Sequence, residues 1–71
     1  MEGKEVTGAM VQHRGCMLLQ PNLDSGVTIY DEQGHRFFHT FKDHILSEDE
    51  AISIIDAALY MREVENERFN K

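Results

Sequence analysis

The spacing of the apolar residues changes near Ile45, and this change limits the fold more than any other feature of the sequence. Before Ile45 the apolar residues alternate with polar ones or form short runs, which is typical of β-strands. After Ile45 they recur every three or four residues, which is typical of an amphipathic helix. We therefore expect an α+β fold, with a sheet over about residues 6–41 and one C-terminal helix packed on one face of that sheet.

The predicted helix has a clear start signal. Ser47 is followed three residues later by Glu50, the spacing at which each side chain can bind a free backbone amide of the first turn. Acids at 48–50 also complement the positive end of the helix dipole. The helix should run from about residue 48 to about residue 65 and fray over residues 66–71. Its apolar stripe comprises Ala51, Ile52, Ile54, Ile55, Ala58 and Leu59, and its polar stripe comprises Ser53, Asp56, Tyr60, Glu63 and Glu67.

Residues 31–34, Asp-Glu-Gln-Gly, fit a type I turn whose glycine adopts the left-handed conformation and closes a hairpin. This turn sets Ile29 opposite Phe37 and Tyr30 opposite Arg36. The earlier part of the sheet is open to two interpretations. Residues 6–12 and 16–20 form either two strands with a turn between them or one longer bent strand. We favour a meander of three or four antiparallel strands, because sequential strands joined by short turns usually pair with their neighbours.

One sheet face is expected to meet the helix through Ile29, Phe37 and Phe41. The other face then carries Tyr30 and Phe38, two large aromatic side chains that a single helix cannot also cover. An exposed patch of this kind usually marks an interface in a protein without a membrane span. The candidate partner surface consists of Met17, Leu19, Tyr30, Arg36 and Phe38.

The end of the predicted helix offers a second surface. Met61, Val64 and Phe69 lie beyond the length of helix that a small sheet can cover. They either pair with a second copy of the chain or anchor the C-terminus on the sheet edge. Together with the acids Asp56 and Glu63, they form the candidate dimer or helix surface.

The composition is that of one small domain over residues 1–71. The 71 residues are 41% hydrophobic and 28% charged, which argues against a disordered chain and, without a long apolar run, against a membrane-spanning one. A chain of this length buries only about 60% of the surface of its unfolded form, so the core should be marginal. Seven basic and 13 acidic residues give a net charge of −6, which opposes attachment to nucleic acid or anionic lipid. No secretory leader is recognisable, so the cytoplasm is the expected location.

The sequence predicts no catalytic, cofactor or metal site. His35 and His39 are four residues apart on a predicted strand, about 13 Å at 3.3 Å per residue, too far to share one ion. Cys16 and His13 form the one local pair of a nucleophile and a base, and three residues apart on a strand they point to opposite faces. A buried structural thiol is the better interpretation of Cys16. No glycine-rich phosphate loop is present.

Residues 26–62 comprise a hairpin with a phenylalanine-rich second strand and a helix that starts Ser-Glu-Asp-Glu-Ala. This layout resembles that of small DNA-binding domains such as integrase arm-binding domains. It is also similar to HicB-type antitoxin domains, in which strands lead into a helix that starts near a Glu-Ala pair. The sequence departs from a DNA-binding sheet because it offers only Arg14, Arg36 and Lys42 where DNA readout needs a cluster of basic residues.

We therefore expect a small, acidic, non-enzymatic protein that interacts with other proteins. It would act as a homodimer that docks onto an unidentified protein partner, as an accessory or regulatory factor of the kind that phages and mobile elements encode. The alternative is a nucleic-acid-binding regulator that uses the sheet face with Arg14, Arg36, Lys42 and the histidines. The net charge of −6 makes nucleic acid the less favoured partner.

Overall fold

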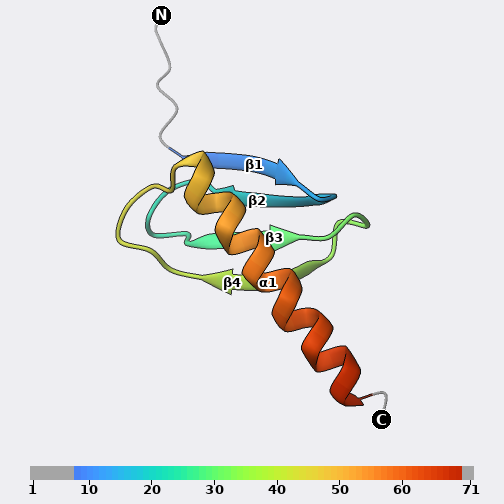
Figure 1. Ribbon diagram of the computed structural model, residues 1–71. Helices are drawn as coiled ribbons and strands as arrows, with labels where there is room; N and C mark the ends of the chain where they lie inside the picture. Colours follow the sequence, from blue (N-terminus) through green and yellow to red (C-terminus); the bar gives the residue numbers. More distant parts are fainter. Residues whose placement is uncertain (1–7, 70–71) are drawn as a thin grey trace, which may run out of the picture.

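The computed structural model describes residues 8–69, with side chains up to residue 67. It contains, in chain order, β1 (Ala9–His13), β2 (Cys16–Gln20), β3 (Val27–Tyr30), β4 (Arg36–Thr40) and α1 (Glu48–Phe69). The strands form one antiparallel sheet in the order β1-β2-β3-β4, and α1 crosses a single face of it (Figure 1). The predicted α+β meander with a C-terminal helix is confirmed, with four strands. Residues 6 and 7 of the predicted first strand lie outside the described part of the chain.

A two-residue turn separates β1 from β2. This region therefore forms two strands and not one longer bent strand. Arg14 and Gly15 both have positive φ, 54° and 81°, and His13 pairs with Cys16 across the turn. Positive φ at both central positions is the geometry whose twist matches that of the flanking strands. Because Arg14 has a Cβ, its left-handed conformation costs about 1–2 kcal/mol.

The turn between β3 and β4 has the predicted geometry. Gly34 has a φ of 85° and donates its N–H to the carbonyl of Asp31 at 3.0 Å. The Asp31 carboxylate accepts the N–H groups of Gln33 and His35, both at 2.9 Å. These two hydrogen bonds lower the pKa of Asp31, and the bond from His35 has the largest effect.

A bulge in β4 shifts the predicted pairing by one residue. Tyr30 faces Arg36 as expected, but Ile29 faces Phe38 and not Phe37, so Phe37 is the extra residue. Because side chains alternate along a strand, one inserted residue moves every later side chain to the opposite face. The prediction that Phe38 lies on the open face is therefore wrong. It pairs with buried Ile29 and packs against the core.

The same shift accounts for Phe41, which was expected to contact the helix. Its side chain is 63% exposed and its ring lies edge-on to that of His39, with the ring centroids 4.9 Å apart. The bulge turns His39 and Phe41 away from α1 together. The core therefore has Phe37 and Phe38 packed against it, and Phe38 takes the place expected for Phe41.

The core lies between the sheet and the first three turns of α1. Its buried members are Cys16, Leu18, Val27 and Ile29 from the sheet, Leu46 from the connection, and Ala51, Ile55 and Ala58 from the helix. The predicted apolar stripe of the helix is confirmed, since its other members, Ile52, Ile54 and Leu59, are partly buried.

Gln20 is the buried polar residue among the described core positions, with no exposed surface. Its Nε2 donates to the carbonyl of His44 at 2.9 Å, and its Oε1 accepts the N–H of Leu46 at 2.9 Å. The side chain thus satisfies two backbone groups of the connection between β4 and α1. It holds that connection against the end of β2.

The helix starts as predicted and ends later. Glu50 donates its N–H to Ser47 Oγ at 3.2 Å, and Ser47 donates its N–H to Glu50 Oε1 at 2.9 Å. The 22 residues of α1 span about 33 Å at 1.5 Å per residue, about twice the length of a five-residue strand. The C-terminal part consequently projects beyond the sheet (Figure 1), and every side chain from Tyr60 to Glu67 is exposed. Residues 66–69, expected to be frayed, belong to the helix, and residues 70–71 are not described.

Candidate functional site

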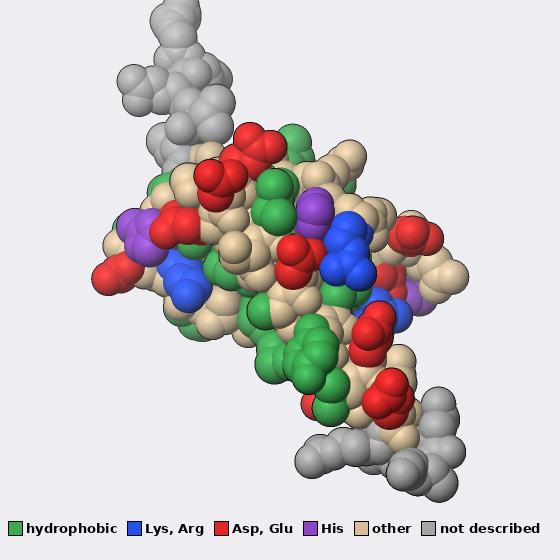
Figure 2. All heavy atoms as spheres, viewed as in Figure 1, with side chains coloured by type: hydrophobic (Ala, Val, Ile, Leu, Met, Phe, Trp, Pro, Cys, Tyr) green, Lys and Arg blue, Asp and Glu red, His purple; other side chains and the backbone are tan. Residues whose placement is uncertain are grey.

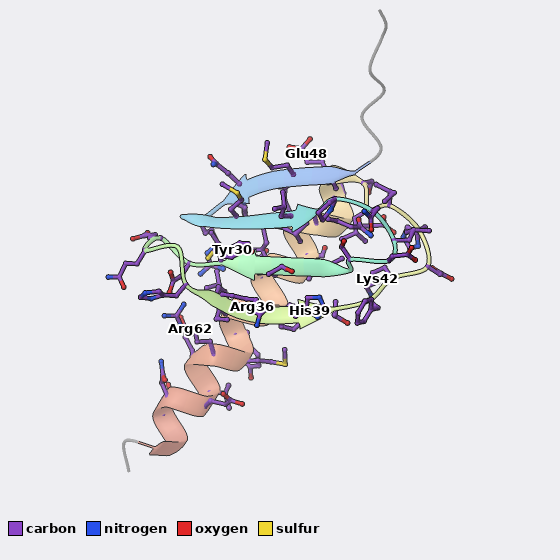
Figure 3. All side chains as sticks on the ribbon, turned by 180° about the vertical axis from the view of Figure 1, so that it is seen from behind. Tyr30, Arg36, His39, Lys42, Glu48 and Arg62 are labelled. Carbon is purple, nitrogen blue, oxygen red and sulfur yellow. The ribbon has the colours of Figure 1, made fainter. Side chains whose placement is uncertain are left out.

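The sheet face opposite α1 carries two rows of side chains that cross all four strands. The pairing aligns Met10, Leu19, Thr28 and His39 in one row and Gln12, Met17, Tyr30 and Arg36 in the other. None of the described elements covers these rows. Figure 3 shows this face toward the viewer, with α1 behind the sheet and Tyr30, Arg36 and His39 at its β3–β4 side.

The central strands of this open sheet face are mainly apolar, and its edge strands carry Gln12, Arg36 and His39 beside Met10. Met10 is 69% exposed, and Met17, Leu19 and Tyr30 are partly exposed. None of the four described strands contains Asp or Glu, although the chain has a net charge of −6. The described acids lie in the turns and on α1, so the strands of this face carry no carboxylates, and Asp31 and Glu32 line a hollow at its edge with Gln12, Met17 and Tyr30.

Four of the five residues predicted as a partner surface meet on the open sheet face: Met17, Leu19, Tyr30 and Arg36. Phe38 is the exception, because the bulge turns it toward the core. Sequence reasoning did not include Met10 and His39 in this surface. Met10 could have been found from the alternation of β1 once its turn with β2 was assigned.

The residues predicted for the helix surface do not all lie on one exposed surface. Met61 and Val64 are exposed, at 48% and 36%, and Glu63 is exposed as well. Asp56 instead fastens the helix to the turn between β1 and β2, since its Oδ1 accepts bonds from His13 Nε2 and Arg14 Nη1, both at 3.0 Å. These two hydrogen bonds lower the pKa of Asp56, and the bond from Arg14 has the largest effect. The side chain of Phe69 lies outside the described part of the structure.

A shallow hollow of about 220 Å³ opens where the two turns meet the helix. Its lining consists of Arg14, Cys16, Asp31, Glu32, Gln33, Leu59 and Arg62. Cys16, which is 4% exposed, is part of this lining, and burial raises the pKa of its thiol. A buried, protonated thiol is a poor nucleophile, which fits the structural role expected of Cys16. The two arginines are engaged with Asp56 and Asp31.

His44 lies between two carboxylates before the helix start. Its Nδ1 is 2.9 Å from Asp43 Oδ1 and its Nε2 is 3.1 Å from Glu50 Oε2. Both hydrogen bonds raise the pKa of His44, and the bond with Asp43 has the larger effect. Within residues 8–67, no three side chains of the metal-ligating types converge in a way that could hold an ion.

Within the described part of the chain, no helix has both the length and the apolar character needed to cross a membrane. No known protein family, curated protein or solved structure matches this chain.

Proposed function

We propose that the protein is a small non-enzymatic interaction protein that works as a homodimer, in which the open sheet faces of two copies pack together. The observation that carries this proposal is the uncovered pair of rows centred on Met17, Leu19 and Tyr30. Apolar faces of this kind on small proteins usually serve as interfaces.

The distribution of charge supports a second copy as the occupant. Two molecules with a net charge of −6 repel each other at a distance. The strands of their open sheet faces contain no Asp or Glu, so the centres of these faces can meet without bringing carboxylates together. A two-fold contact also lets Arg36 and His39 at the β4 rim of one copy lie over neutral residues of the other.

The size of the face sets the strength expected of this dimer. Four strands of about five residues span roughly 19 Å by 16 Å, a plan area of roughly 300 Å². Stable interfaces bury about 800 Å² on each partner. The dimer should therefore be weak, reversible and favoured by added salt, which screens the repulsion between acidic molecules.

The experiment compares the two tyrosines of the chain. Tyr30 lies in the open sheet face, and Tyr60 is 68% exposed on the projecting helix. The solution mass is measured by light scattering over a dilution series for the wild type, Tyr30→Ser and Tyr60→Ser. We expect Tyr30→Ser to shift the monomer–dimer midpoint to at least about tenfold higher concentration, and Tyr60→Ser to leave it unchanged.

A wild type that stays monomeric at all concentrations would overturn the homodimer. A midpoint that moves only with Tyr60→Ser would place the contact on the helix. Circular dichroism of both variants shows whether the fold is retained, since neither tyrosine belongs to the buried core.

The alternative function is nucleic-acid binding by the same face. Arg36 and His39 end the two rows on β4, and Lys42 follows them in the chain (Figure 3). Its test is the anisotropy of a labelled single-stranded oligonucleotide titrated at low and at high salt. Binding that weakens steeply with salt and is lost in Arg36→Gln would support this alternative, and no binding at low salt would remove it.

A further inference from the structure

The helix α1 carries a second apolar stripe that the fold does not use. Ala57, Tyr60, Met61 and Val64 are all exposed, and their spacing of i, i+3, i+4 and i+7 places them on one side of a helix. At 100° per residue this stripe is centred roughly 140° from the buried stripe of Ala51, Ile55 and Ala58. We call these four residues the helix seam. Figure 2 shows hydrophobic side chains gathered on the projecting part of α1, with acidic side chains beside them.

Glutamates border the helix seam on both sides. Glu63 and Glu67 lie along one edge and Glu65 along the other, by the same helical spacing. None of the three forms an ion pair with another side chain that the structure describes. The one described cation of this segment, Arg62, is already engaged, 3.6 Å from Asp31 and 4.8 Å above the ring of Phe37.

A hollow beside the helix seam extends the apolar surface. It measures about 280 Å³ and lies between α1 and β4, where Phe37, Phe38 and Met61 form part of its wall. Met61 therefore belongs both to the seam and to the hollow. A side chain from a docked helix can enter this hollow while its backbone follows the seam, which is the usual geometry of a helix bound in a groove.

We propose that the helix seam docks a basic amphipathic helix of a partner protein, whose apolar stripe lies on Tyr60, Met61 and Val64 and whose Lys or Arg side chains meet the flanking glutamates. Charge complementarity selects this occupant. A second copy would bring three more glutamates against the same edges, and like charges across a helical seam are destabilising. This inference does not rest on the proposed sheet-face homodimer, because the two surfaces share no residue.

The test uses designed peptides of about 18 residues, or five helical turns. The first has Leu at seam spacing flanked by Lys, the second has the same composition in scrambled order, and the third has Glu in place of Lys. Binding of each labelled peptide to the full chain is followed by fluorescence anisotropy. We expect saturable one-to-one binding of the first peptide, at least about tenfold tighter than that of the other two.

Variants locate the binding site. Met61→Ser and Val64→Ser should each weaken binding of the basic amphipathic peptide at least about fivefold, whereas Tyr30→Ser should leave it unchanged. Both residues are exposed, so the core is expected to remain folded. The double variant Glu63→Gln and Glu65→Gln should also weaken binding, and its remaining affinity should depend less on salt.

Three results would overturn the proposal. Equal binding of the scrambled peptide would show that net charge alone attracts it. Binding of the first peptide that survives Met61→Ser and Val64→Ser would place it elsewhere. A fall in solution mass caused by Val64→Ser, with no such fall for Tyr30→Ser, would assign the helix seam to a second copy of this chain.

Discussion

The guanidinium of Arg62 lies over the ring of Phe37, with its central carbon 4.8 Å from the ring centroid. Arg62 lies on α1, and Phe37 is the extra residue of the β4 bulge. The Nη2 atom of the same guanidinium is 3.6 Å from Asp31 Oδ2 at the neighbouring turn. One side chain thus links the helix to both irregular positions of the β3–β4 hairpin.

Replacement of Arg62 by Met should lower the free energy of unfolding by about 0.5–1 kcal/mol, since it removes the cation–π contact and keeps the apolar stem. Urea denaturation measures this loss. Arg36→Met is the matched control, because Arg36 is exposed on the open sheet face, and it should change stability by less than about 0.5 kcal/mol. Equal effects of the two substitutions would contradict a specific role for Arg62.

Replacement of Gln20 by Leu should destabilise the fold by about 1–3 kcal/mol. The substitution keeps the volume but leaves the buried N–H of Leu46 without its acceptor. Thermal and urea denaturation measure the effect, and Gln12→Leu is the control, since Gln12 is exposed on the open sheet face. If Gln20→Leu were as stable as the wild type, the amide of Leu46 would have to find another partner.

Stability should depend on pH with a plateau between about pH 4.5 and pH 6.5. The pKa of His44 is raised above its ordinary value of 6.5, so its contribution is complete below that value and is lost as the pH rises through the raised pKa. The pKa values of Asp31, Glu50 and Asp56 are lowered, so their contributions are present above their ordinary range and are lost as the pH falls.

The variant His44→Gln tests the upper edge of this plateau. The unfolding temperature of the wild type should fall between pH 6 and pH 8, and the fall should be smaller in His44→Gln. His35→Gln is the control, because the ring of His35 is 75% exposed and lies 4.0 Å from its nearest carboxylate. Loss of the pH dependence in His35→Gln alone would show that His44 is not the group responsible.

The sequence predicted those parts of the fold that depend on neighbouring residues. Ser47 and Glu50 form the expected cap, and residues 31–34 form the expected turn. The bulge at Phe37 was not predicted, because strand alternation does not show where an extra residue enters a strand, and the contact of this ring with Arg62 joins residues 25 positions apart. Without the bulge, alternation assigns Phe38 to the wrong face.

The same limit applies to the candidate surfaces. Met17, Leu19, Tyr30 and Arg36 were placed together correctly, because strand alternation is a local property. The role of Asp56 was not predictable in this way, because its partners His13 and Arg14 lie more than 40 residues away. The sequence placed Gln20 at the end of a strand, and only the folded chain shows which backbone groups its side chain satisfies.

The length of α1 beyond the sheet gives the two halves of the helix different local stabilities. Amide hydrogens from Ala51 to Leu59 belong to hydrogen-bonded turns that pack on the core, so we expect them to exchange with solvent more slowly than those of the projecting segment. Those from Glu63 to Glu67 belong to a helical segment whose side chains are exposed, and a short helix without packing is marginal in water. Their exchange rate therefore measures how often the last turns fray. A ligand that binds this segment would lower the exchange rate of each amide in the turns that it stabilises.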